Sequence, residues 1–132
     1  MERHHISLAV KTRVVSEFID ITPLLEQEIA KVRVATGFCI VYIPHTTAGI
    51  TINENADPDV RADILAALHH IVPALPYRHG EGNSPAHIKA SLLGFSVTVP
   101  IDNGKLALGT WQGVYLAEFD GPRTRRVEVY LG

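Results

Sequence analysis

Three histidines, His45, His79 and His87, are the residues of this chain whose type and surroundings could do chemistry. A neutral imidazole binds divalent metal ions and also transfers protons near neutral pH. On one continuous helix, residues eight positions apart, such as His79 and His87, would lie roughly 12 Å apart along the axis, too far to share an ion. Gly80 and Gly82 stand between them and give the backbone the freedom to fold back. The spacing alone therefore permits a site or an ordinary turn.

The residues after this glycine loop favour a site. Ser84 and Pro85 predict the start of a short helix, which puts His87 at its third position. Backbone N–H groups at such a helix end attract anions, and the positive end of the helix disfavours a protonated imidazole. We therefore expect His87 to be neutral, which is the form that binds a metal ion.

His45 lies in a polar stretch, residues 44–49, that directly follows an apolar run. A polar loop at the end of a buried strand is a common place for a site, because the strand holds the loop side chains in position. The same hydroxyl groups of Thr46 and Thr47 could instead cap local backbone groups in a turn. Both interpretations stay open for this stretch.

The other four histidines are expected to be structural or exposed. His69 and His70 fall in the last turn of a predicted helix, where a histidine interacts favourably with the helix dipole without any ligand. His4 and His5 alternate along a predicted strand and are interpreted as surface residues.

Two arginines near the C-terminus could bind an anion. Arg123 and Arg125 are two positions apart, so they share one face of a strand and could grip a phosphate or carboxylate. They could equally be charges that keep an edge strand from pairing with another chain. Glu118 could pair with these arginines or orient a histidine. Asn83 and Gln112 could add hydrogen bonds to a bound substrate.

Three helices are predicted, at residues 23–35, 58–71 and 85–93, each by the same signal. A capping residue stands directly before a proline that suits the first helical position. Apolar residues then recur at helical spacing in the first two helices. The three capping pairs are Thr22-Pro23, Asp57-Pro58 and Ser84-Pro85.

The rest of the chain predicts β-strands. Residues 4–11 alternate apolar and polar side chains, the pattern of a half-buried strand, and residues 38–43 are continuously apolar, which predicts a strand buried on both faces. Further strands are expected at 14–21, 49–54, 96–101, 105–108, 114–119 and 125–131, with a hairpin turn at 102–104. The order predicts an α+β fold, a largely antiparallel β-sandwich with about three helices, in a single domain over residues 1–132.

Composition narrows the class of protein. Twelve Lys and Arg against fourteen Asp and Glu give a net charge of −2, which argues against a general nucleic-acid binder. No apolar run approaches the length that crosses a membrane. The single cysteine, Cys39, cannot form an intramolecular disulfide, so we expect a cytoplasmic protein. Within its apolar run, Cys39 is expected to be a small core residue.

Three segments resemble a known family. They read HTTAGITINENADPDV, HGEGNSPAHIKASLLG and GTWQGVYLAEFDGPRTRR in this order, and they resemble the YjbQ family, small proteins described as secondary thiamine-phosphate synthases. The likeness covers nearly the whole chain. It implies a β-sandwich of α+β type, the YjbQ-like fold, that assembles as a homotrimer.

The resemblance also implies a site and a reaction. His45, His79 and His87 would form a catalytic cluster around a divalent metal ion, for which zinc is a candidate. The reaction would be a weak condensation of a hydroxymethylpyrimidine diphosphate with a thiazole phosphate. A metal that binds diphosphate is more often magnesium held by carboxylates. A metal-dependent hydrolase of a small metabolite and a non-catalytic metal- or ligand-binding protein are therefore the alternatives.

The substrates that this reaction requires are small phosphorylated metabolites. The residues expected to hold their phosphate groups, or to add hydrogen bonds to them, are Arg123, Arg125, Asn83, Gln112, Thr46 and Thr47. No nucleic acid and no membrane is expected as a partner.

Overall fold

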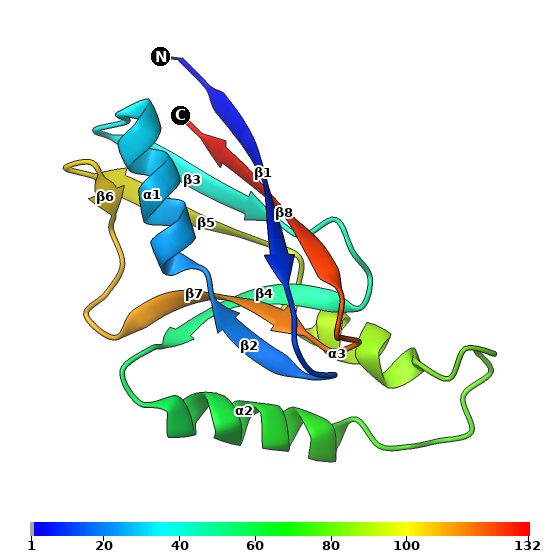
Figure 1. The fold of residues 1–132 in the computed structure, drawn as a ribbon. Coiled ribbons are helices and arrows are strands. Elements are labelled where there is room, and N and C mark those ends of the chain that lie inside the picture. Colours follow the sequence, from blue (N-terminus) through cyan, green and yellow to red (C-terminus); the bar gives the residue numbers. More distant parts are fainter. Residues whose placement is uncertain (1) are drawn as a thin grey trace.

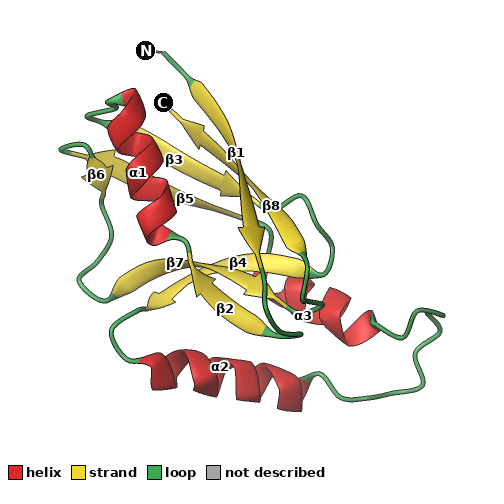
Figure 2. Cartoon of the chain, in the orientation of Figure 1, coloured by secondary structure: helices red, strands yellow, loops and turns green. Residues whose placement is uncertain are grey.

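Eight strands and three helices make up the fold of residues 2–132, the part of the chain that the computed structural model describes (Figures 1 and 2). Their order agrees with the predicted order of elements. The elements are β1 (His4–Lys11), β2 (Glu17–Asp20), α1 (Thr22–Val32), β3 (Gly37–Tyr42), β4 (Ala48–Glu54), α2 (Pro58–Ile71), α3 (Ser84–Leu93), β5 (Ser96–Asp102), β6 (Lys105–Leu106), β7 (Gln112–Glu118) and β8 (Thr124–Leu131).

The strands form two antiparallel sheets. The larger sheet has the order β1-β8-β3-β5-β6, and the smaller sheet has the order β2-β7-β4. The two sheets pack together with α1, and α2 and α3 lie beyond the smaller sheet (Figure 1). The predicted α+β fold with a largely antiparallel β-sandwich is confirmed.

Two apolar clusters hold these layers together. The main cluster fills the space between the sheets, where Leu25 and Ile29 of α1 meet side chains such as Val41, Leu116 and Val129. A smaller cluster joins α2 and α3 to the outer face of the smaller sheet through Leu68, Ala86, Ala90, Ala117 and Phe119. Because β7 is the central strand between these two clusters, almost all of it is buried.

The position of α3 depends on a glycine of β4. A Cβ atom at Gly49 would lie 2.6 Å from the carbonyl oxygen of Gly94, which ends α3. Real Cβ atoms do not approach backbone that closely, so a side chain at Gly49 would push α3 away from the sheet. The absence of a side chain at Gly49 therefore lets the C-terminal end of α3 lie directly against β4.

The prediction that residues 38–43 are buried on both faces is wrong. Cys39, Val41 and Ile43 are buried, while Phe38, Ile40 and Tyr42 are 42–57% exposed. In a strand, successive side chains point to opposite faces, and within residues 2–132 the outer face of β3 keeps its side chains exposed. An uncovered apolar face looks the same in the sequence as a buried one.

The helix bounds are largely as predicted, with α2 matching residue for residue. Helix α1 ends three residues before the predicted Ala35, because Arg33 takes a left-handed conformation with φ of 57° and closes the helix on the carbonyl of Ile29. Ile71, the last residue of α2, continues the apolar spacing of this helix but is 63% exposed. The predicted hairpin is confirmed, with Asn103 and Gly104 both at positive φ, although β6 is only two residues long.

Only one of the three predicted helix caps forms. The carboxylate of Asp57 accepts a hydrogen bond of 2.9 Å from the backbone N–H of Asp59 and caps α2. Thr22 does not cap α1, because its hydroxyl accepts a hydrogen bond from the N–H of Val114 instead. Ser84 is already inside α3, whose cap position holds Asn83 without a capping hydrogen bond.

Replacing Asp57 by alanine is expected to lower the free energy of unfolding by about 1 kcal/mol, because one N–H of α2 loses its acceptor. Ser84→Ala is the matched control and should change the free energy by less than about 0.5 kcal/mol. Urea denaturation of the three proteins compares them directly. Equal losses in the two variants would contradict this assignment of the caps.

Cys39 is a core residue, as expected. Burial, together with the charge of Glu26, raises the pKa of its thiol to about 12. A thiol with this pKa holds about a thousandfold less thiolate at pH 8 than an ordinary cysteine. We therefore expect Ellman's reagent to leave the native protein essentially unmodified and to titrate one thiol in guanidinium chloride. Fast modification of the native protein would show that Cys39 is accessible.

None of the helices in residues 2–132 is long and apolar enough to cross a membrane.

Candidate functional site

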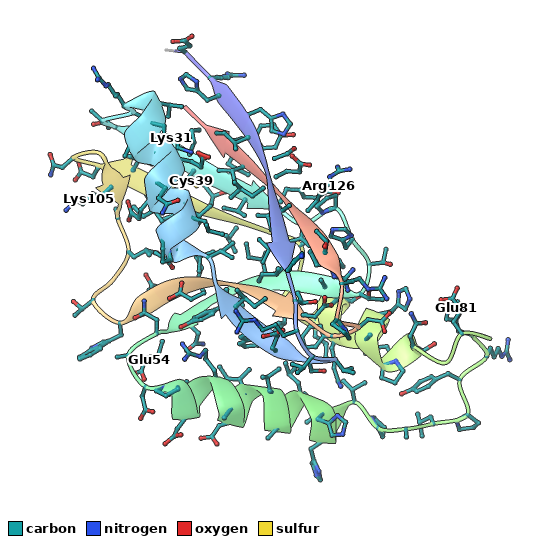
Figure 3. All side chains as sticks on the ribbon, in the orientation of Figure 1. Lys31, Cys39, Glu54, Glu81, Lys105 and Arg126 are labelled. Carbon is teal, nitrogen blue, oxygen red and sulfur yellow. The ribbon has the colours of Figure 1, made fainter. Side chains whose placement is uncertain are left out.

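Four segments meet at one end of the sandwich. They are the β3–β4 loop, the end of β7, the β7–β8 turn and the start of α3, joined by hydrogen bonds between residues far apart in the sequence. Figure 3 shows Arg126 on β8 beside this loop and Glu81 on the segment that leads into α3. All three candidate histidines lie on or next to these segments.

His79 and His87 come together, as the glycine loop between them predicted. Their ring centroids are 5.6 Å apart and the ring planes are nearly perpendicular, at 86°. The chain reverses between them in a turn, where the N–H of Gly82 donates to the carbonyl of His79 at 3.3 Å and Gly82 has a φ of 78°. This positive φ is the conformation for which glycine is suited.

The distance between these two rings suits a shared metal ion. Two imidazoles on one tetrahedral ion, with bonds of about 2.0–2.1 Å, place their ring centroids about 5 Å apart. A direct edge-to-face contact between the rings would give a similar distance. Within residues 2–132, no three side chains of His, Cys, Asp or Glu are grouped in a way that could hold an ion. The geometry thus offers two protein ligands rather than the implied three.

His45 is engaged elsewhere. Its Nε2 atom accepts a hydrogen bond of 2.9 Å from the backbone N–H of Arg126. Burial lowers the pKa of His45, and the nearby charges of Arg125 and Arg126 lower it further, so the ring is neutral at pH 7. A neutral ring whose Nε2 accepts a hydrogen bond carries its proton on Nδ1. Neither nitrogen of His45 then has a free lone pair for a metal ion.

A buried ion pair supports the loop that carries His45. Arg125 and Glu118 are 2% and 0% exposed, and Arg125 Nε lies 2.8 Å from a carboxylate oxygen of Glu118. The guanidinium also donates to the hydroxyl of Thr47 at 2.8 Å. Burial raises the pKa of Glu118, but hydrogen bonds from Arg125, the Asp120 N–H and Thr12 outweigh it and hold the pKa below its ordinary value.

This pair changes the interpretation of the two arginines. Arg125 is only 2% exposed, and its Nε and Nη2 groups donate to Glu118 and Thr47, so its charge is already paired inside the protein. Arg123 precedes β8 and is exposed, so the two do not share one strand face. Arg123 donates to the backbone carbonyl and the carboxylate of Asp120 at 2.9 and 3.1 Å. The structure matches the pairing of Glu118 with an arginine rather than a two-arginine grip.

Asn83, the residue that precedes α3, has an unused acceptor. Its Nδ2 group donates to Asp120 at 2.9 Å, and because a carboxylate only accepts, the amide nitrogen must face Asp120. The amide oxygen, Oδ1, is buried and has no hydrogen-bond partner within residues 2–132. Buried polar atoms without partners are rare, so this atom indicates that a donor or a cation belongs next to it.

The start of α3 offers little to an anion. Pro85 has no N–H, and the N–H groups of Ala86 and His87 both donate to the carbonyl of Asn83. The expectation that free N–H groups of this helix bind phosphate is therefore not met. Their hydrogen bonds close the first turn instead.

Thr46 and Gln112 lie in very different places. Thr46 is exposed on the β3–β4 loop, next to His45, and remains available to a ligand. Gln112 begins β7 while Glu118 ends it, so about 20 Å separates Gln112 from the histidine end of the strand. The side chain of Gln112 accepts a hydrogen bond from the N–H of Gly109 at 2.8 Å. Within one chain, Gln112 is not part of this site.

Two residues of the site carried no signal in the sequence. Thr12 donates a hydrogen bond to Glu118, 106 positions away, and the backbone of Arg126 donates to His45, 81 positions away. Such contacts depend on how β1 and β8 pair, which local patterns do not encode.

Comparisons with known proteins place this chain in a family. Residues 6–131 match the family model described as UPF0047 protein YjbQ-like. The UPF0047 protein MJ1081 of Methanocaldococcus jannaschii is 53% identical over 123 residues, which cover 92% of this chain and 89% of the relative. The UPF0047 protein YugU of Bacillus subtilis is 50% identical over 121 residues, which cover 90% and 92%.

Solved structures agree with these matches. A YjbQ/UPF0047 family protein of Clostridium acetobutylicum superposes with a TM-score of 0.93 at 55% identity, covering 96% of this chain and 99% of that protein. A YbjQ-like protein of Sulfolobus solfataricus superposes with a TM-score of 0.93 at 33% identity, covering 98% and 96%. Because the family model matches residues 6–131 and these relatives are 50–53% identical over at least 90% of the chain, the chain belongs to the YjbQ-like UPF0047 family.

Proposed function

We propose that this chain is a metal-dependent transferase that acts on small phosphorylated metabolites, with condensation of a hydroxymethylpyrimidine diphosphate and a thiazole phosphate as the reaction to test first. The reaction comes from the resemblance of the three quoted segments to the YjbQ family. The observation that carries the metal site is the approach of His79 and His87 to 5.6 Å between ring centroids. The unpartnered Oδ1 of Asn83, on the residue before α3, adds an acceptor near them.

The surrounding residues have distinct proposed roles. Arg123 is exposed and would turn from Asp120 to a phosphate group, and the Thr46 hydroxyl would donate to the same substrate. His45, neutral and protonated on Nδ1, would donate a hydrogen bond from Nδ1 to the substrate. A bound divalent metal would stabilise the negative charge that develops on the leaving diphosphate. Arg125 and Glu118 position the His45 loop without touching the substrate.

Purified protein loaded with zinc, manganese or magnesium should be assayed against two substrate classes. The first is the pyrimidine diphosphate with the thiazole phosphate, and the second is a panel of phosphoesters and amides that a metal-dependent hydrolase would cleave. The proposal predicts thiamine phosphate formation that His79→Ala abolishes and His70→Ala, an exposed histidine of α2, leaves unchanged. Hydrolysis alone would support the hydrolase, and no turnover with intact metal binding would support a non-catalytic binding protein.

We also propose that the chain forms the homotrimer implied by the family through the outer face of its larger sheet. Phe38, Ile40, Tyr42 and Tyr130 are 42–57% exposed there, on β3 and β8, which are adjacent strands. An open groove of about 680 Å³ runs along this face between Arg3, Phe38, Ile40 and Tyr130. An apolar sheet face of this kind is typical of an interface between subunits. The proposed occupant is a second copy of this chain.

Light scattering of the purified protein tests this surface. Wild-type protein should have the mass of three chains, and Ile40→Glu should shift it toward the mass of one. Val15→Glu is the matched control, because Val15 is 61% exposed on the β1–β2 loop, away from this face. A monomeric wild type, or a trimer unaffected by Ile40→Glu, would contradict the proposal.

The buried thiol of Cys39 suits the cytoplasm, which we propose as the location.

A further inference from the structure

A second pocket lies on the far side of α3 from the histidine pair. It has a volume of about 260 Å³ and is lined by Ser16, Leu65, Ala66, His69, Lys89 and Phe119. Lys89 is two residues after His87, and two residues turn an α-helix by about 200°, so their side chains leave α3 in nearly opposite directions. The pocket is therefore distinct from the candidate metal site.

Lys89 is the unusual member of this pocket. It is only 7% exposed, and within residues 2–132 no carboxylate lies within ion-pair distance of its ammonium group. Its hydrogen-bond partner is Nδ1 of His69, at 3.4 Å, a long bond to an imidazole nitrogen. Burying an ammonium group without an opposite charge costs free energy, so lysines usually extend their charged end to water. Lys89 is buried without such a charge partner in residues 2–132, so an anion bound in the pocket would compensate its ammonium group.

The rest of the pocket limits what this anion can be. The side chains of Leu65, Ala66 and Phe119 give the pocket apolar walls. Its polar lining residues are Lys89, His69 and Ser16. One ammonium group matches a single negative charge, whereas a phosphate or diphosphate normally needs several donors. A cavity of about 150 Å³ holds benzene, so this larger pocket has room for a ring with a carboxylate attached.

We propose that the pocket between α2, α3 and the end of β7 binds a small monocarboxylate with an aromatic or branched apolar body, its carboxylate on Lys89 and its body against Phe119. His69 and Ser16 add hydrogen bonds at the polar end of the pocket. The entrance lies at Ala66 and His69, which are both exposed. This site is independent of the metal site, and either can exist without the other.

Calorimetric titration with benzoate tests the site, with benzamide as the uncharged probe of the same shape and inorganic phosphate as the anion without an apolar body. Wild-type protein should bind benzoate at least about tenfold more tightly than benzamide or phosphate, since the charge pair and the apolar contact are both required. Lys89→Met should weaken benzoate binding by at least about tenfold. Lys31→Met, which changes an exposed lysine of α1, should leave it unchanged.

A second variant separates ligand binding from folding. Ala66→Leu keeps Lys89 and its charge but fills the entrance, and it should also weaken benzoate binding at least about tenfold. Circular dichroism should show both variants folded, because Lys89→Met replaces an uncompensated charge by an apolar chain of similar length. Equal binding of benzoate and benzamide, no detectable binding by the wild type, or benzoate binding that survives both substitutions would overturn the proposal. Preference for phosphate would also overturn it.

Discussion

Arg125→Met should lower the free energy of unfolding by about 3–5 kcal/mol, the largest loss that we expect from any single substitution in this chain. The variant leaves Glu118 buried at 0% exposure without its charge partner and removes the donor to the Thr47 hydroxyl. Guanidinium denaturation followed by circular dichroism measures the change. Arg123→Met is the matched control and should cost less than about 1 kcal/mol, because its ion pair with Asp120 is exposed.

The double variant Glu118→Leu, Arg125→Met sharpens this result. Removing both charges leaves no buried ion, so the double variant should be more stable than Arg125→Met alone. If Arg125 instead served mainly to bind a ligand, its substitution would hardly change stability and the double variant would be no better.

The pKa of Glu118 is held below 4.5, so the contribution of its carboxylate to the free energy of unfolding is present above pH 4.5 and is lost as the pH falls below that value.

The second large effect concerns metal affinity. His79→Ala or His87→Ala should each weaken zinc binding by at least about a hundredfold, because each removes one of two protein ligands and a metal ion held by a single imidazole binds weakly. His45→Ala should change the affinity by less than about threefold, since its Nε2 atom already accepts the N–H of Arg126. Competition with a chromophoric chelator at pH 7.5 measures all three variants.

The zinc affinities of these variants also show whether His45 is a ligand. A loss at His45 as large as that at His79 would show that the ring leaves Arg126 and joins the metal, as the family resemblance implies. His70→Ala, on the exposed end of α2, controls for zinc that binds to surface histidines. Unchanged affinity in both His79→Ala and His87→Ala would rule out the two-histidine site.

Much of the fold could be predicted because its signals are local. Alternation in residues 4–11 gave β1 its correct bounds, and the Asp57 cap with the residues that follow it gave α2 its correct bounds. The outer face of β3 could not be predicted, since Phe38, Ile40 and Tyr42 have the side chains of a core strand. Whether a second layer covers an apolar face is a property of the tertiary structure.

The site was predictable in part for the same reason. The approach of His79 to His87 follows from the short glycine loop between them, which is a local feature. The buried position of Arg125 does not follow from a local feature. Two arginines two positions apart look equivalent in the sequence until β8 pairs with its neighbours and turns one of them inward. The predicted cap at Thr22 does not form, and the Thr22 hydroxyl accepts from Val114 of β7. Ser84 does not cap because α3 already begins there, and the Asn83 amide at the cap position donates to Asp120.

Long-range proton–nitrogen correlation spectra of the histidine rings, recorded before and after addition of one equivalent of zinc, test the proposed metal site most directly. One ring nitrogen of His79 and one of His87 should move to the metal-bound position. His45 should keep its proton on Nδ1 in both spectra, because the Arg126 N–H holds its Nε2 atom. Spectra in which the signals of His79 and His87 do not change with zinc would contradict the central claim.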